Sequence, residues 1–313
     1  MKKRIILAGG SGFLGNSLAR RFIAAGCEVI VLTRKPEGRS DGVKEVLWDA
    51  KSVGEWAAHV DGADVVINLT GKSVDCRYTE KNRRAIIESR VNSTRAVGEA
   101  IARSAKPPRV WLNASSATLY KHVFDHPMDE SGETGATAEA KDAFSIEVIR
   151  QWERALDEAR TPNTRKVALR ITMVFGPHDG VFPVLRRLAR LGLGGKLGSG
   201  KQYVSWIHVE DFCRAIEWII EREDFREPVN IAAPNPLPNA EMMRLMRKSC
   251  GAPFGLPATE WMLEIGAFFL RTETELILKS RRVVPGKLLA SGFHFHFSHL
   301  ENALRDLEHR KAG

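Results

Sequence analysis

The first 25 residues constrain the fold of the chain more than any other segment. An apolar run at residues 4–8 leads directly into the glycine-rich stretch GGSGFLG, and an amphipathic stretch follows at 16–25. Glycines at this spacing permit a tight turn, close approach of backbone N–H groups to a pyrophosphate, and close packing of the helix. The start of a helix also offers a favourable dipole to an anion. We therefore predict a dinucleotide site, rather than a glycine turn without a ligand, formed by Gly9, Ser11, Gly12, Phe13, Leu14 and Gly15.

Short β-branched runs alternate with amphipathic segments through the first half of the chain. The predicted strands lie at residues 4–8, 28–33, 45–48, 65–69 and 110–113, with a sixth at 166–171. Strands that alternate with helices imply a parallel sheet covered on both faces. The fold class we predict is α/β, a Rossmann-type doubly wound parallel sheet.

The length of the chain predicts a second lobe. At 313 residues it exceeds the usual size of a single core. We predict an NADP-binding Rossmann domain at residues 1–175, completed by about 204–227, and a smaller α+β substrate-binding lobe at residues 176–313.

The choice of dinucleotide is predicted from the end of the second strand. An NAD site usually places an acid there for the ribose hydroxyls, whereas this chain has Thr33, Arg34 and Lys35. An acid would repel a 2′-phosphate, and a guanidinium gains a charge-assisted hydrogen bond of roughly 1.5 to 3 kcal/mol. We predict NADP(H), with a solvated basic turn as the alternative.

Polar residues at the ends of two further strands are also candidates for cofactor binding. Asp49 follows the third predicted strand and could accept a hydrogen bond from the adenine amino group. Thr70 and Gly71 follow the fourth strand, at the edge where open sheets hold ligands. Ordinary turn formation is the alternative for all three residues.

Composition narrows the classes of partner. The formal charge is +9, but lysines and arginines are spread along the chain, which favours a solvated basic surface over nucleic-acid binding. No apolar run reaches the roughly 18 to 20 residues of a membrane span. The start MKKRIILAGG runs into glycines too early for a signal peptide, so we expect a cytoplasmic protein. Four scattered cysteines without a C-x-x-C spacing are expected to be reduced thiols.

Several motifs together resemble the extended short-chain dehydrogenase/reductase superfamily, and more narrowly its YfcH-like epimerase-family branch. They are GGSGFLG, NLTG, CRYTEKNRRAIIESRVNST, SSATLY, the pair Trp152-Glu153, LGLGGKLGSGKQYVSWIHVED and SRRVVPGKLLASGFHF. The resemblance covers nearly the whole chain. It implies a Rossmann lobe that binds NADP, a C-terminal substrate lobe, and an oxidoreductase or epimerase without an agreed substrate.

The resemblance also implies a Tyr and a Lys four residues apart on a helix, where the Tyr exchanges a proton with the substrate oxygen. Aligned by the preceding strand, these positions fall on Phe144 and Val148. A shifted alignment does not restore the pair, because none of the three tyrosines, at positions 78, 120 and 203, has a lysine four residues later. The chain therefore contains no Tyr-x-x-x-Lys pair.

The remaining candidate catalytic residues lie on one loop. Ser116 matches the serine that holds the substrate oxygen in the superfamily, and Tyr120 and His122 follow closely. One hypothesis is that Tyr120 or His122 replaces the missing proton donor. The alternative, which we favour, is that this loop only shapes the pocket.

The resemblance extends the candidate binding sites. Residues expected near the cofactor are Leu69, Arg90, Ser115, Thr172 and Val174, with Arg90 in place of a supporting asparagine. Residues expected near the substrate are Arg77, Lys196, Gln202, Trp206 and His208, although His208 could equally be a core histidine. No metal site is expected, because the alternating tract FHFHFSH has a strand-like period and precedes a capping box at Ser298 and Glu301.

Two functions fit these expectations. The first is an NADP(H)-binding oxidoreductase or epimerase that acts on an unidentified small organic substrate without the usual Tyr-x-x-x-Lys pair. The second is a catalytically silent NADP(H)-responsive regulator or sensor. The amphipathic segments at 80–104 and 138–160 are compatible with a monomer or a homodimer.

Overall fold

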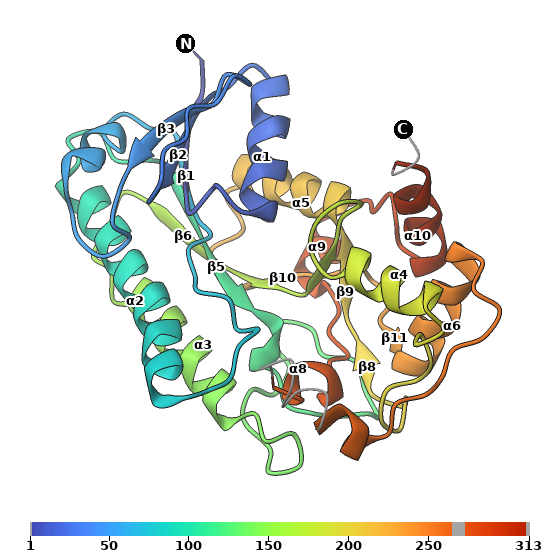
Figure 1. Ribbon diagram of the computed structural model, residues 1–313. Coiled ribbons are helices and arrows are strands. Elements are labelled where there is room, and N and C mark those ends of the chain that lie inside the picture. The colour runs from blue at the N-terminus through green and yellow to red at the C-terminus, as the bar shows by residue number, and fades with distance from the viewer. Residues whose placement is uncertain (1, 265–272, 311–313) are drawn as a thin grey trace.

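The core of the protein is a seven-stranded parallel sheet (Figure 1). The structure is a computed structural model that describes residues 2–264 and 273–310. The strand order is β10-β6-β5-β4-β1-β2-β3. The strands are β1 (Arg4–Ala8), β2 (Glu28–Thr33), β3 (Lys44–Leu47), β4 (Val65–Asn68), β5 (Val110–Ser116), β6 (Arg165–Ile171) and β10 (Val229–Ile231).

The order of the strands reverses between β1 and β4. From β1 the chain proceeds to β2 and β3 on one side, and then returns to β4, β5, β6 and β10 on the other. Both neighbours of β1 are parallel to it, with Ala8 opposite Leu32 of β2 and Asn68 of β4. This arrangement confirms the predicted doubly wound sheet and puts a topological switch point, where such sheets bind ligands, at the carboxyl end of β1.

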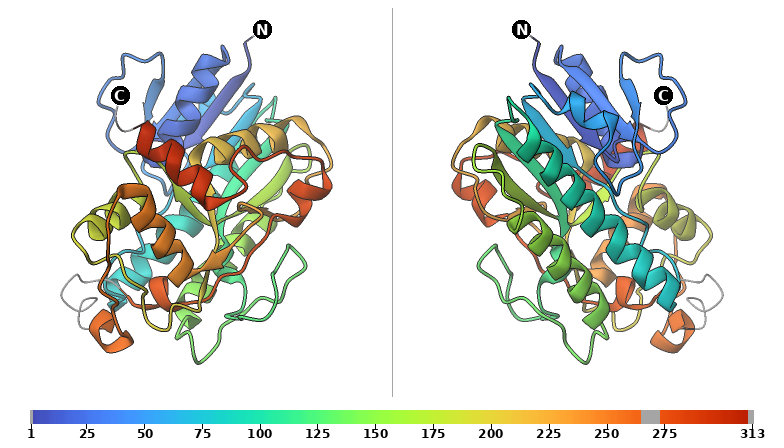
Figure 2. Two further views of the ribbon diagram at one scale, coloured as in Figure 1. Left: turned by 90° about the vertical axis from the view of Figure 1, so that its right-hand side faces the viewer. Right: turned by 90° about the vertical axis from the view of Figure 1, so that its left-hand side faces the viewer.

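Helices cover both faces of the sheet. On one face α1 (Phe13–Ala24) and α5 (Val209–Glu221) bury Leu18, Phe22, Phe212 and Ile216 against the strands. On the other face α2 (Glu80–Arg103) and α3 (Ala143–Asp157) lie side by side, as the right-hand view of Figure 2 shows. Aliphatic side chains in both layers explain why the strands read as continuous apolar runs rather than alternating ones.

A third core cluster packs beside the sheet. It joins α4 (Phe182–Arg190), α6 (Asn239–Cys250) and α10 (Leu300–His309) through Phe182, Met246 and Leu304. Short pairs of strands connect it to the rest: β7 (Met173–Phe175) with β9 (Trp206–His208), and β8 (Tyr203–Val204) with β11 (Leu237–Pro238). The short helices η1 (Glu55–His59), η2 (Ala117–Leu119), α8 (Glu275–Leu278) and α9 (Gly286–Ala290) complete these elements.

The predicted strands agree with the structure to within a few residues at each end. The last sheet strand, β10, follows the segment 204–227. One local prediction is wrong. The helix α10 begins at Leu300 after His299, without a capping bond from a described side chain, so Ser298 does not form the predicted capping box. The boundary at residue 175 stays a prediction. Within the described ranges, no helix combines the length and the apolar character of a membrane span.

Candidate functional site

The glycine loop leaves open space at the N-terminal end of α1. A Cβ atom on Gly9, which has a φ of +69°, would lie 2.6 Å from Thr70 Oγ1, and one on Gly15 would lie 2.4 Å from Gly10 Cα. By contrast, a Cβ on Gly12 would meet no described atom within 4 Å. Gly12 is also the N-cap residue, and no described side chain caps it. The loop is therefore packed tightly from behind and open where an anion could approach the helix.

Thr70 lies at the switch point with an unused polar atom. Its backbone N–H donates to Asn68 Oδ1 at 3.1 Å, and Asn68 in turn donates to Asn113 Oδ1 at 2.8 Å. Thr70 Oγ1 is buried and has no hydrogen-bond partner among the described residues. Buried hydroxyls are nearly always bonded, so this atom fits one that a ligand satisfies. Thr172, also predicted near the cofactor, instead donates from Oγ1 to the carbonyl of Ile231 at 2.8 Å.

Cations gather at the end of β2. Arg34 and Lys35 are exposed directly after Thr33, whose buried Oγ1 accepts a hydrogen bond from the Lys35 N–H at 3.3 Å. Sequence analysis missed Arg39, whose guanidinium donates to Asn16 Oδ1 on α1 at 2.5 Å and also pairs with the Asp41 carboxylate. A positive turn beside the glycine loop fits a phosphate on the adenosine ribose.

Asp49 is occupied by its own turn. Its carboxylate accepts hydrogen bonds from the Lys51 N–H at 2.8 Å, the Ser52 N–H at 2.9 Å and the Ser52 hydroxyl at 2.6 Å. The bonds from Ser52, together with that from Lys51, lower the pKa of Asp49 to about 2. These contacts support the turn-forming alternative for Asp49.

The contacts of Tyr120 support the favoured alternative, in which the loop of Ser116, Tyr120 and His122 shapes the pocket. The side chain is 1% exposed, and its hydroxyl donates to Asn230 Oδ1 at 2.8 Å while accepting from Arg170 at 3.0 Å. Arg170 also binds Glu153 through two nitrogens, and Glu153 accepts from Ser115 at 2.5 Å. Both sides of the hydroxyl are engaged inside the protein, so Tyr120 and Ser115 belong to one buried network.

The other two residues of this loop also hold local structure. Ser116 accepts a hydrogen bond from the Thr118 N–H at 3.2 Å and so caps η2. The His122 side chain is 5% exposed, its Nδ1 accepts from the Ser280 N–H at 2.8 Å, and its Nε2 lies 3.6 Å from Glu139. These contacts favour the interpretation that the loop shapes the pocket.

Phe144 stands beside a polar cluster that sequence analysis did not select. The Tyr78 ring packs edge-on against Phe144, with centroids 4.7 Å apart, and the Arg83 guanidinium lies 4.6 Å from the Phe144 centroid. The Tyr78 hydroxyl is 3.4 Å from Glu275 Oε1, and Ser145 donates to the same carboxylate oxygen. Glu275 is 130 positions from Ser145 in the chain, so no local pattern could have revealed this contact. Val148 is buried on α3.

Burial shifts the titration of the groups in this region. It raises the pKa of Tyr78 to about 12, with a further contribution from the nearby Glu275 carboxylate. It also raises the pKa of Glu275 above its usual range. Burial lowers the pKa of Arg90 to about 10; this guanidinium donates to the Lys72 and Ile86 carbonyls at 3.0 Å and lies over the Trp152 ring.

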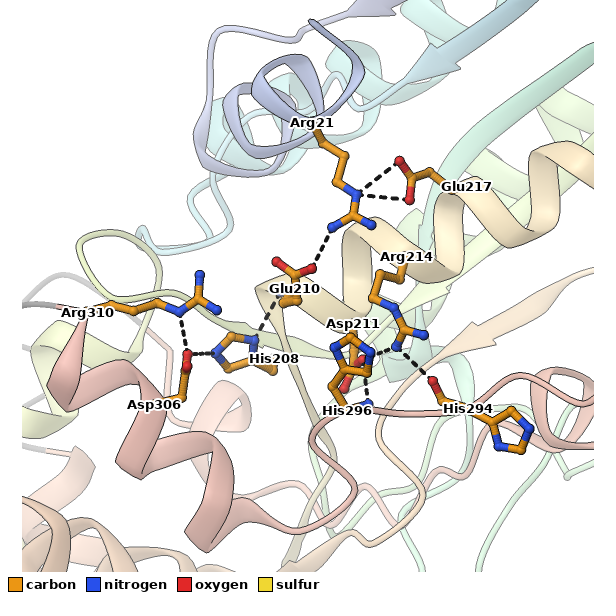
Figure 3. Close-up of polar contacts among 10 residues, drawn as sticks. All are labelled: Arg21, His208, Glu210, Asp211, Arg214, Glu217, His294, His296, Asp306 and Arg310. Atoms are coloured by element: carbon orange, nitrogen blue, oxygen red, sulfur yellow. Dashed lines mark hydrogen bonds and ion pairs between the residues drawn. The ribbon is translucent and has the colours of Figure 1, made fainter. Parts of the chain in front are cut away.

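Trp206 and His208, two of the residues expected near the substrate, lie in the interior. Both side chains have no exposed surface. The Trp206 indole stacks on Phe175 and donates to the Asn235 carbonyl at 3.2 Å. His208 accepts from the Glu210 N–H at 3.0 Å and lies 3.1 Å from Asp306, as Figure 3 shows.

Of the remaining predicted substrate residues, one is buried and two keep exposed surface. Gln202 is 2% exposed and donates to the Leu197 carbonyl at 2.9 Å, so it holds its own loop. Lys196 is exposed, and Arg77 is partly exposed and lies 3.5 Å from Glu273. Arg77 and Lys196 therefore keep the surface that a substrate contact requires.

Comparisons with known proteins identify the class and then the family. The fold and the glycine loop define a Rossmann-type nucleotide-binding protein, and residues 5–232 match the model of the NAD dependent epimerase/dehydratase family. Residues 258–307 match a domain of unknown function, DUF1731. The chain belongs to the NAD dependent epimerase/dehydratase family.

Relatives match over nearly their whole length. The epimerase family protein YfhF of Bacillus subtilis is 31% identical over 309 residues, which cover 97% of both chains. The crystal structure of human epimerase family protein SDR39U1 (isoform 2) with NADPH superposes with a TM-score of 0.86 at 27% identity, covering 98% of this chain and 99% of that one. A UDP-N-acetylglucosamine 4-epimerase from Bacillus cereus, at 15% identity and a TM-score of 0.75 over 100% of this chain and 97% of its own, shares the fold alone.

Proposed function

We propose that this protein binds NADP(H) and uses it in an oxidoreductase or epimerase reaction on a small organic substrate. The observation that carries the proposal is the open space at Gly12, with Arg39 bonded to Asn16 of the same helix and with Arg34 and Lys35 exposed at the end of β2. The human relative solved with NADPH supports the choice of cofactor.

The residues of the site divide between the parts of the dinucleotide. The N-terminal end of α1 at Gly12 would hold the pyrophosphate, and Arg34 and Lys35 would hold the 2′-phosphate. Thr70 would supply its unpaired hydroxyl at the switch point. When bound, the nicotinamide supplies hydride chemistry, while the chain orients the ring and excludes water.

Cofactor preference is tested by fluorescence titration with NADPH and NADH. In the wild type we expect tighter binding of NADPH. Arg34→Ala should weaken NADPH binding by about 10- to 100-fold, because one charge-assisted hydrogen bond is worth roughly 1.5 to 3 kcal/mol, and should leave NADH binding unchanged. Arg222→Ala, in an exposed ion pair far along the chain, is the matched control. Equal preference in wild type and Arg34→Ala would contradict the role of Arg34.

Turnover is tested with a small-molecule extract of the source cells. Loss of the reduced nicotinamide signal by the wild type, but not by Gly12→Val, identifies an enzyme, and fractionation of the extract identifies its substrate. The second candidate function is an NADP(H)-responsive regulator, which the apolar side chains of Phe144 and Val148 favour. Tight binding without consumption across repeated extracts supports the regulator.

We also propose a compartment, a class of partner and an assembly for this protein. The four cysteines at positions 27, 76, 213 and 250 are free, which is compatible with a reducing compartment such as the cytoplasm. We propose a small molecule as the partner, with no nucleic acid or membrane, and a monomer or a homodimer as the assembly.

A further inference from the structure

Three polar side chains from separate parts of the chain meet beside Phe144. Tyr78 comes from the loop before α2, Ser145 from the first turn of α3, and Glu275 from the start of α8. Glu275 is 8% exposed, accepts a hydrogen bond from Ser145 and lies 3.4 Å from the Tyr78 hydroxyl. Phe144, the position expected for the missing tyrosine, contacts the Tyr78 ring directly. The phenol of Tyr78 and the carboxyl group of Glu275 therefore lie beside Phe144, where the resemblance implies a tyrosine.

Tyr78 has a combination of features that the other two tyrosines lack. Tyr120 is 1% exposed, and its hydroxyl is held by Asn230 and Arg170. Tyr203 lies in β8, where its ring packs under the Arg282 guanidinium. Tyr78 and Tyr203 are both partly exposed, but among the described residues only Tyr78 has a hydroxyl bonded to a carboxylate.

Cations surround the phenol. Arg83 donates to the Tyr78 carbonyl at 2.9 Å and lies 5.8 Å from the centroid of its ring. Arg90 of α2 and Arg281 also interact electrostatically with Tyr78. Positive charge near a phenol favours the phenolate, so these arginines oppose part of the rise that burial and Glu275 cause in the pKa of Tyr78.

We propose that Tyr78 is the proton donor to the carbonyl oxygen of the substrate and that Glu275 returns the proton to Tyr78. This inference rests on the proposed function. The substrate class it implies is an aldehyde or ketone, because a protonated phenol can donate to a carbonyl oxygen that is being reduced.

The step balances as a two-electron reduction. Bound NADPH would supply a hydride to the carbonyl carbon, the C=O π bond would break, and the oxygen would take the proton of the Tyr78 O–H. The resulting phenolate takes the proton of the Glu275 carboxylic acid, and solvent reprotonates the carboxylate. The sum is carbonyl, NADPH and one proton converted to alcohol and NADP⁺. Burial, which raises the pKa of Glu275, increases the share of its acid form near neutral pH.

The first test compares Tyr78→Phe with Tyr203→Phe and the wild type. Each is assayed for NADPH consumption with 4-nitrobenzaldehyde as carbonyl probe and with the small-molecule extract, and each is titrated with NADPH. We expect Tyr78→Phe to lose about 10²- to 10⁴-fold in kcat with unchanged NADPH affinity, and Tyr203→Phe to keep its rate. Retained turnover in Tyr78→Phe overturns the inference but leaves the enzyme in place. A wild type that binds NADPH and consumes none with either substrate source overturns both proposals.

The second test needs neither cofactor nor turnover. Tyrosines labelled with ¹³C at Cζ are followed by NMR against pH, and Tyr78→Phe assigns the resonance. Glu275 is faced by Asp142, Lys279 and Arg281 as well as Tyr78, so an inflection belongs to Glu275 only if the substitution Glu275→Gln removes it. We expect an inflection above the usual glutamate pKa of about 4.3 in the wild type and none in Glu275→Gln. An unchanged Tyr78 titration in Glu275→Gln would show that the two groups are uncoupled and would overturn the relay.

Discussion

At the scale of single residues, burial decides which polar side chains can act on a ligand. Three side chains from motifs that look functional form hydrogen bonds with neighbours inside the protein: those of Trp206, His208 and Tyr120. Tyr78 lies in a loop and keeps partial exposure. His208 lies in the interior, and its effect on stability depends on pH.

The neutral form of His208 is the one that the fold accommodates. Burial lowers its pKa from about 6.5 to about 4, although Asp306 opposes the shift. Below pH 6.5 the unfolded chain therefore binds a proton that the folded protein does not bind until about pH 4. Because stability falls wherever the unfolded state binds more protons, we expect His208 to cost stability progressively as the pH drops through this range.

His208→Asn tests this prediction, because an asparagine oxygen can still accept the Glu210 N–H at the start of α5 and does not titrate. Urea unfolding at pH 7 and pH 5 should show a smaller loss of stability for His208→Asn than for the wild type. The exposed His294 offers a control substitution, His294→Asn. An equal loss in the wild type and His208→Asn would exclude His208 as the source.

At the scale of elements, the glycine loop between β1 and α1 has one glycine that packing requires and one that it does not. Gly15 is required by packing, because its Cβ would overlap the backbone of Gly10. Gly12 is not required by packing, because its Cβ would face open space at the helix N-terminus. The two glycines should therefore respond differently to substitution.

Gly15→Ala should destabilise the protein by about 1 to 3 kcal/mol, as overpacking usually does. Gly12→Asp should keep stability, since Asp is a favoured N-cap residue, and should weaken NADPH binding by more than about tenfold through repulsion of the pyrophosphate. Chemical denaturation and NADPH fluorescence titration measure the two effects. Loss of stability in Gly12→Asp, or full NADPH affinity there, would contradict this division.

Sequence patterns predicted this element and its sheet well, because period, glycine spacing and strand ends are local properties. They identified Gly12 and the cations after β2, but not Arg39, whose bond to Asn16 spans 23 positions. They could not place Glu275 next to Tyr78, since the two lie 197 positions apart. They also could not show which side chains of LGSGKQYVSWIH point inward, because basic and aromatic residues occur in loops and in cores alike.

At the scale of the whole molecule, one buried carboxylate on α5 binds the backbone of the C-terminal segment. Asp211 of α5 is fully buried and accepts the N–H groups of His296 and Phe297 at 2.9 Å and 2.8 Å. It also pairs with Arg214, which donates to the His294 carbonyl at 2.7 Å (Figure 3). This clamp, formed by Asp211 and Arg214, holds the tract before α10 against a helix that lies on the Rossmann sheet.

Asp211→Asn should open this clamp for two reasons. The site already presents three hydrogen-bond donors, and the asparagine amide adds more. The substitution also removes the negative charge that pairs with Arg214. We expect a loss of about 2 to 4 kcal/mol, since a buried carboxylate bonded to backbone N–H groups and a guanidinium is costly to replace. Hydrogen exchange followed by mass spectrometry should show faster exchange over residues 293–310, with the strands around the glycine loop still protected. Asp224→Asn, which removes only an exposed pair with Arg222, should change neither region. Uniformly faster exchange across β1 and β4 in Asp211→Asn would mean that the C-terminal segment and the Rossmann sheet unfold as one unit.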